Sequence, residues 1–174
     1  MKRFAKWGAV LLLVALAAFF LFAPAMVERG ANRVVGTQAT VSDRARALHS
    51  RLAIADLHDD TLLWNRDLLH ESDRGHVDLP RLREGHVALA TFSSVSQSPR
   101  GQNYDSNAAT DQLWLLAIAQ LQPVRTWFSP LERTLFHGQK LAQAIAASGG
   151  QLHAIRTRGD VAALLASRAQ GRDV

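Results

Sequence analysis

The chain has no cysteine among its 174 residues. This absence excludes a disulfide framework, a thiolate-ligated zinc site, a cysteine nucleophile and a lipid-modified N-terminal cysteine. It says nothing about the redox compartment, because a chain without cysteine is compatible with any compartment. A metal site in this chain would have to be built from histidine and oxygen ligands.

Surplus charge is also scarce outside the N-terminus. The formal net charge is +5, and it falls to +2 without three basic residues at the start of the chain, Lys2, Arg3 and Lys6. The high pI therefore reflects that start in part, and we expect no nucleic-acid partner. With 48% apolar and 20% charged residues, the composition is typical of a globular protein, and the length allows one domain with a core.

Residues 1–27 have the pattern of a signal anchor or a signal peptide. Three basic residues precede an uncharged run, Trp7 to Val27, whose 21 residues would span roughly 31 Å as a helix. Ala23-Pro24-Ala25 resembles a signal-peptidase site, so cleavage stays open beside an uncleaved anchor, which the long run slightly favours. The basic flank predicts that the remaining chain lies on the periplasmic or extracytoplasmic side, membrane-anchored or, after cleavage, secreted.

The stretch Ile54-Ala55-Asp56-Leu57-His58-Asp59-Asp60-Thr61 joins an apolar, strand-like run to one histidine and three carboxylates. Side chains at i and i+2 of a strand point to the same face, so His58 and Asp60 should project together, with Asp56 one step back. An imidazole beside a carboxylate at a strand end makes a two-point chelate for a divalent metal such as zinc. The competing interpretation is a polar loop after a core strand, in which His58 is solvated or hydrogen-bonded.

Two other chemistries fit this stretch poorly. A phosphatase with an aspartyl nucleophile requires Asp-x-Asp-x-Thr, but the residue two before Asp60 is His58. Glycosidase chemistry requires two carboxylates that face each other across the bond to be cleaved. Asp56 and Asp60 lie four residues apart on one strand and do not supply that arrangement. The metal interpretation therefore remains.

Hydrophobic periodicity and turn residues predict alternating strands and helices. Asp78, Pro80 and Gly85 mark the start and end of a helical crossover between the first two strands. A strand–helix–strand repeat predicts an α/β fold with a parallel sheet. The expected strands are residues 52–57, 87–95 and 151–155, and the expected helices are residues 41–52, 62–69, 110–121, 130–148 and 157–169.

Two motifs resemble those of the membrane (renal-type) dipeptidases, zinc metallopeptidases among the amidohydrolase-like barrels. Asp56-Leu57-His58-Asp59-Asp60 matches a D-G-H-N-D-like motif, and His76-Val77-Asp78-Leu79-Pro80-Arg81-Leu82 matches H-x-D-[IL]-P-R-[LM]. The two motifs have the order and spacing of the family, and the resemblance is clear over residues 53–95. The chain departs from the family at Leu57 and Asp59, at His86, where a second glycine is common, and at the second strand, Thr91-Phe92-Ser93-Ser94.

The resemblance implies a (β/α)8 TIM-like metallo-hydrolase barrel that hydrolyses dipeptides with two Zn2+ ions. Carried over to this chain, it makes His58 and Asp60 two ligands of one zinc. It also implies a bridging Glu and two further His from later strands, whereas only Asp160 and Asp173 provide carboxylates from residue 151 onward. We therefore expect residues 51–174 to form the N-terminal part of the barrel, after a spacer over 28–50, and to be inactive alone.

The resemblance leaves the catalytic residues unassigned and is compatible with a homodimer. Outside the two ligands, His76 is expected to serve a structural hydrogen-bonding role, because Pro80 makes a helix start more probable there than a strand. His137 and His153 are expected to be ordinary histidines of a helix and a strand. An alternative function is a non-catalytic, membrane-anchored envelope protein that retains only the start of the fold.

Overall fold

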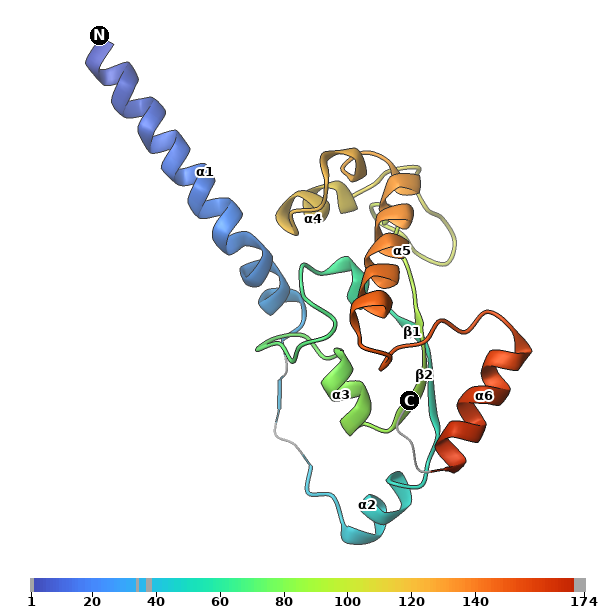
Figure 1. The fold of residues 1–174 in the computed structure, drawn as a ribbon. Helices are drawn as coiled ribbons and strands as arrows, with labels where there is room; N and C mark the ends of the chain where they lie inside the picture. The colour runs from blue at the N-terminus through green and yellow to red at the C-terminus, as the bar shows by residue number, and fades with distance from the viewer. Residues whose placement is uncertain (1, 34, 37–38, 171–174) are drawn as a thin grey trace.

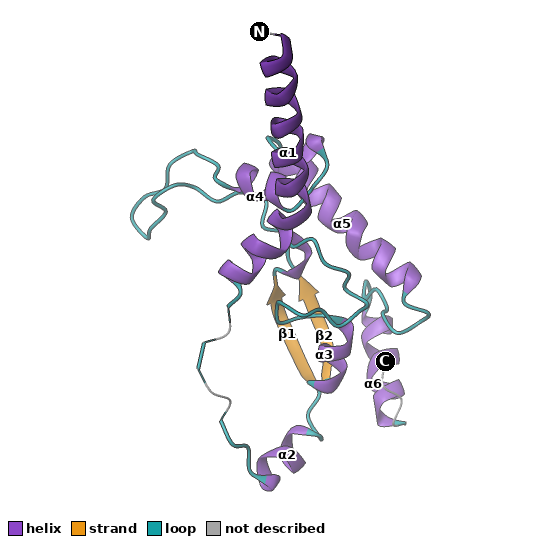
Figure 2. Ribbon diagram, turned by 90° about the vertical axis from the view of Figure 1, so that its left-hand side faces the viewer, coloured by secondary structure: helices purple, strands orange, loops and turns teal. Residues whose placement is uncertain are grey.

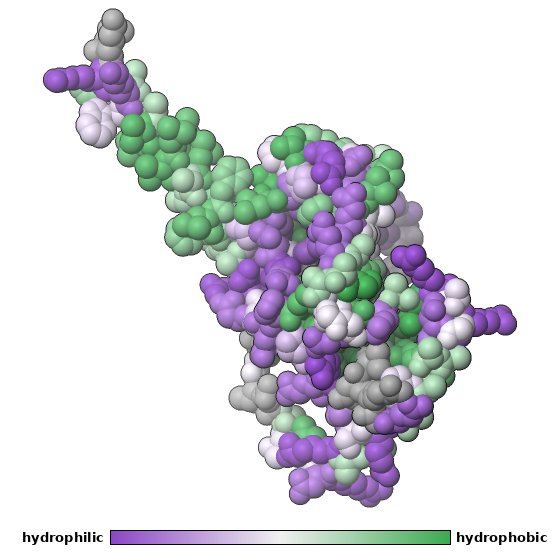
Figure 3. Space-filling view, viewed as in Figure 1, coloured by the Kyte–Doolittle hydropathy of each residue, from purple (hydrophilic) through white to green (hydrophobic). Residues whose placement is uncertain are grey.

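Helix α1 (Lys2–Ala31) projects from a mixed domain that the later part of the chain forms (Figure 1). The computed structural model describes residues 2–33, 35–36 and 39–170. Apolar side chains cover most of the projecting part of α1 (Figure 3). By length and composition, this helix is suited to cross a membrane as an anchor or to serve as a signal sequence.

The last turns of α1 belong to the core of the domain. Ala23 is 5% exposed and Glu28 is fully buried. Arg66 and Arg74 donate from their Nε atoms to the Glu28 carboxylate, over 2.5 and 2.8 Å. Gln120 donates from Nε2 to the carbonyl oxygen of Pro24 over 3.1 Å. α1 therefore continues past the uncharged run into the segment that we expected to be a spacer.

Strands β1 (Ile54–Asp59) and β2 (Val87–Phe92) form a parallel pair, in which Ile54 lies opposite Val87 and Asp59 opposite Phe92. Their arrowheads point in the same direction, toward the end of the domain from which α1 leaves (Figure 2). Parallel strands require a crossover connection, and α3 (Leu79–Glu84) lies within it. The predicted α/β unit with a parallel sheet is confirmed for these two strands.

The cap residues of α3 behave as the sequence predicts. Asp78 is the N-cap, and its carboxylate accepts a hydrogen bond from the amide of Arg81 over 3.1 Å. Gly85 is the C-cap, and the next residue, His86, has a φ of 53°. This left-handed conformation favours glycine. The ring of His86 contacts that of His49, with their centroids 5.3 Å apart, at the end of helix α2 (Asp43–His49).

Helix α5 (Pro130–Ala147) packs against the short 3-10 helices η1 (Thr61–Leu63) and η2 (Val124–Thr126), and α4 (Leu113–Ala119) packs against α1. The buried apolar residues of this core include Leu62, Leu63, Leu79, Leu82, Leu113 and Ala117. The predicted helices over residues 41–52, 110–121 and 130–148 are thus present, with α2 and α4 shorter than expected.

The expected helix over residues 62–69 is not formed beyond η1. The amide of Asn65 donates to Gln120 Oε1 over 2.8 Å, and the amide of Leu69 donates to Asp67 Oδ1 over 2.9 Å. Since side chains bind these amides, they do not join a helical ladder.

The expected third strand over residues 151–155 is also absent, and that segment is irregular. Gly149 and Gly150 have φ angles of 63° and 84°, so the chain turns directly after α5. The hydroxyl of Ser148 then accepts a hydrogen bond from the amide of Leu152 over 3.1 Å. This hydrogen bond holds residues 151–155 at the end of α5. The same residues line a cleft of about 950 Å³ beside β2. Helix α6 (Arg158–Ala169) follows, opened by the predicted capping box of Thr157 and Asp160.

Candidate metal site at the carboxyl end of the sheet

His58 and Asp60 lie side by side where β1 ends. His58 Nε2 is 3.3 Å from Asp60 Oδ1, and the two side chains are 74% and 42% exposed. His58 is the second-last residue of β1, and Asp60 follows the strand as the N-cap of η1 with φ −95° and ψ 15°, so the turn out of the strand, rather than strand alternation alone, brings the two side chains together at the carboxyl end of the sheet. The predicted juxtaposition is confirmed, and both side chains are accessible from solvent.

The neighbouring strand contributes a residue that the sequence interpretation did not place in the site. Ser93 follows β2, and its amide donates to the carbonyl of Asp59 over 2.8 Å. Its hydroxyl donates to Asp60 Oδ1, the oxygen that faces His58. The signal for Ser93 was its position at a strand end parallel to β1, because carboxyl ends of parallel strands meet at one edge of a sheet.

The other two carboxylates of the stretch hold the local backbone. Asp56 Oδ1 accepts a hydrogen bond from the amide of His58 over 3.0 Å. Asp59 is 5% exposed, and its Oδ1 accepts from the amide of Thr61 over 2.6 Å. Burial raises the pKa of Asp59 above its usual range, and the neighbouring charges of Asp56 and Asp60 act in the same direction. Asp56 and Asp59 therefore shape the strand end around the two candidate ligands.

A buried histidine lies behind this edge of the sheet. His137 of α5 is 1% exposed, and its Nδ1 is 2.8 Å from the hydroxyl oxygen of Ser94. Its Nε2 is 3.3 Å from Gln122 Nε2, which also donates to the carbonyl of Leu63 over 3.2 Å. Because the amide nitrogen is a donor, His137 Nε2 is the acceptor, and Nδ1–H donates to Ser94.

Burial, together with the charges of Lys140 and Arg133, lowers the pKa of His137 to about 4. The imidazole is therefore neutral at neutral pH. It joins the end of β2 to α5 as a hydrogen-bonded core residue, which agrees with the expectation that it is an ordinary histidine of a helix.

The remaining histidines lie away from the candidate ligands. His70 Nδ1 is 2.8 Å from Asp67 Oδ2, and His153 lines the cleft beside β2. His76 is exposed, and within the described ranges its ring has no hydrogen bond, so the structural role expected for it falls to Asp78. Residues 2–33, 35–36 and 39–170 contain no group of three or more His, Asp or Glu side chains that could hold a metal ion.

The donor types of His58 and Asp60 suit zinc, but two protein ligands are fewer than the three that a catalytic zinc site typically uses. The pair can therefore coordinate one metal ion through two side chains, and water would occupy most of the remaining coordination positions. Residues described here offer no carboxylate placed to bridge a second metal at this edge.

Comparisons of the chain with models of known protein families, with curated proteins and with solved structures found no match. The resemblance to the membrane dipeptidases therefore depends on the two motifs and on the residues that carry them.

Proposed function

We propose that this chain contributes the first metal-binding strand of a zinc-dependent membrane dipeptidase. The single observation that carries the proposal is the pairing of His58 with Asp60 at the carboxyl end of two parallel strands. Catalytic residues of α/β barrels gather at that end of the strands. The proposed fold is accordingly the start of a (β/α)8 barrel, and the proposed substrates are dipeptides.

In this proposal His58 Nε2 and the Asp60 carboxylate hold the zinc. The hydroxyl of Ser93 binds the same carboxylate and fixes its orientation, and Asp56 and Asp59 fix the strand end through backbone hydrogen bonds. Bound zinc would supply a Lewis acid that polarises the peptide carbonyl and lowers the pKa of a bound water. Hydrolysis requires further ligands beyond this pair, since two ligands do not complete a catalytic zinc site.

Zinc titration of the purified chain tests the proposal. We expect weak binding of one zinc that His58→Ala and Asp60→Ala each abolish. His76→Ala is the matched control, because His76 is exposed and stands apart from the pair. Equal zinc affinity in all variants would contradict the assignment and favour the alternative, a non-catalytic envelope protein.

We further propose that α1 is an uncleaved anchor and that the domain faces the periplasmic or extracytoplasmic side. Cleavage near Ala25 would remove core contacts of α1, because Ala23 is 5% exposed and the carbonyl of Pro24 accepts a hydrogen bond from Gln120 over 3.1 Å. A purified protein with an N-terminal epitope tag should retain the tag after export. Loss of the tag from the exported protein would show cleavage instead.

A further inference from the structure

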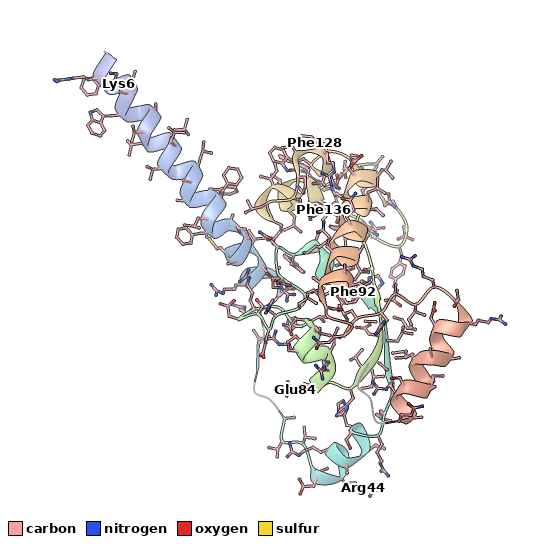
Figure 4. All side chains as sticks on the ribbon, in the orientation of Figure 1. Lys6, Arg44, Glu84, Phe92, Phe128 and Phe136 are labelled. Atoms are coloured by element: carbon pink, nitrogen blue, oxygen red, sulfur yellow. The ribbon has the colours of Figure 1, made fainter. Side chains whose placement is uncertain are left out.

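An exposed apolar surface lies at the end of the domain next to α1. Figure 1 shows α4, η2 and the start of α5 at this end, and Figure 4 places Phe128 there, opposite Arg44. We call this surface the α4–α5 edge. It consists of Leu115, Leu121, Val124, Phe128 and Leu131, which are 58%, 44%, 70%, 74% and 66% exposed.

The α4–α5 edge is a rigid part of the fold. Arg133 is fully buried and donates to the carbonyls of Thr126 and Trp127 over 2.8 and 2.7 Å, and to Asp111 Oδ2 over 2.6 Å. The ring of Trp114 lies against that of Phe128, with centroids 5.7 Å apart. These contacts hold the turn after η2, so Phe128 is presented to solvent by a fixed backbone.

Leu121 occupies a conformation that is costly for a leucine. Its φ is 54°, at the end of α4, where glycine or asparagine usually ends a helix. Side chains with a Cβ are disfavoured in this region, because the Cβ comes close to the following carbonyl oxygen. The fold thus tolerates strain at a position where an apolar side chain is exposed, and such a backbone outlier points to a function for the exposed group.

The α4–α5 edge lies beside the C-terminal end of the uncharged run of α1. α4 packs against α1, and Gln120 binds the carbonyl of Pro24, near the end of that run at Val27. Residues 113–131 contain one charged residue, Arg125, and two tryptophans. The guanidinium of Arg125 is 3.1 Å from Glu132, which lies just beyond the edge. Tryptophan with apolar neighbours and little charge is typical of membrane–water interfaces.

We propose that the α4–α5 edge rests on the surface of the bilayer that α1 spans, as a second membrane contact of the domain. The inference depends on the proposed anchoring by α1. A bilayer is favoured over a protein partner because the apolar residues of the edge, which alternate with polar ones, lie at the same end of the molecule as the apolar surface of α1 (Figure 3). Two contacts fix the domain on the membrane, with the carboxyl end of the sheet directed toward the lipid surface (Figure 2).

Single-cysteine labelling tests this inference, since the chain has no native cysteine. The full chain is reconstituted in phosphatidylcholine–phosphatidylglycerol vesicles with an environment-sensitive fluorophore at one position. Leu13→Cys reports insertion of α1, Phe128→Cys and Leu115→Cys report the edge, and Arg44→Cys is the control at the opposite end. We expect spin-labelled lipids to quench position 13 most, positions 128 and 115 to an intermediate degree, and position 44 not at all.

Each of the other possible quenching results contradicts a different part of the proposal. Quenching at position 13 with none at positions 128 and 115 would refute the contact and leave the anchor in place. An absence of quenching at position 13 would refute the anchor and the contact together. Blue-shifted emission at position 128 without lipid quenching would show that this position is covered by its own chain or by a second copy of it, which refutes the lipid contact. Measuring two edge positions separates a true result from a local defect of one variant.

Discussion

Ser93 binds the same carboxylate oxygen of Asp60 that faces His58. A hydrogen bond of this kind orients a metal ligand, and loss of such a partner typically weakens metal binding about 10–100-fold. Ser93→Ala should therefore raise the zinc dissociation constant by roughly tenfold, which is the lower end of the range for loss of a residue that hydrogen-bonds to a metal ligand. Competition with a fluorescent zinc indicator measures the change.

Ser94→Ala is the matched control for that experiment. The two serines are adjacent, but the hydroxyl of Ser94 binds His137 instead of Asp60. The Ser94→Ala variant should have a lower unfolding free energy than the unchanged protein and the same zinc affinity. An equal loss of zinc affinity in both variants would mean that the effect arises from disturbance of the strand end.

His137 makes stability depend on pH. Its pKa is lowered from 6.5 to about 4 in the folded chain, so between these values the unfolded chain binds more protons than the folded one. The contribution is fully present above pH 6.5 and is lost as the pH falls through 4. A shift of this size corresponds to roughly 3 kcal/mol of unfolding free energy.

Chemical unfolding at several pH values between 4 and 7 measures this dependence. In His137→Gln the difference between pH 7 and pH 4 should shrink by that contribution, because glutamine does not titrate. Because the two proteins are compared by how their unfolding free energy changes with pH, a loss of stability that is the same at every pH does not affect the result. Identical slopes in the two proteins would show that His137 titrates normally in the folded state.

At the scale of elements, α1 and the domain are joined by a buried ion cluster. Glu28 and Arg66 are 0% and 5% exposed at their side chains, and Arg74 is 19% exposed. Removal of one partner from a buried pair typically costs 3–5 kcal/mol, because the remaining charge is left without a counter-charge. Glu28→Gln should therefore lower the unfolding free energy by about 3 kcal/mol in detergent micelles.

Glu84→Gln provides the control, since Glu84 is exposed at the end of α3 (Figure 4). It should change stability by less than about 0.5 kcal/mol, as surface substitutions usually do. If both variants unfold at the same denaturant concentration, the last turns of α1 are not part of the cooperative unit.

The elements that local patterns determine were predictable from the sequence. The proximity of His58 and Asp60, the Asp78 and Gly85 caps of α3 and the Thr157 capping box all depend on residues a few positions apart. Local propensity and turn chemistry are enough to predict features of this kind.

The features that were missed depend on residues far apart in the chain. Gln120 binds the amide of Asn65 and thereby ends a helix that the periodicity favours. Glu28 looks like a spacer residue until Arg66 and Arg74 enclose it. The hydroxyl of Ser93 reaches Asp60 only because the two strands are parallel and Asp59 lies opposite Phe92. Such partners cannot be assigned from one sequence, since hydrogen bonds between distant side chains leave no periodic pattern.

At the scale of the whole molecule, the candidate ligands lie on the same half of the fold as the surfaces that we propose to face the membrane. The strands of the sheet direct their carboxyl ends toward the end from which α1 leaves (Figure 2). A site at that edge would meet substrates close to the lipid surface. This arrangement follows from α1 packing on α4 and from the direction of β1 and β2.

The chain as a whole should not hydrolyse dipeptides, even with zinc. Catalytic zinc typically has three protein ligands and a water, whereas His58 and Asp60 would supply two, and within the described ranges no third His, Asp or Glu joins them. The test is a panel of dipeptides incubated with the full chain in detergent micelles and added zinc, beside His58→Ala. We expect the same background rate in both proteins. Zinc-dependent turnover that disappears in His58→Ala would mean that the chain completes its coordination sphere in another way, such as through a second copy at the same edge.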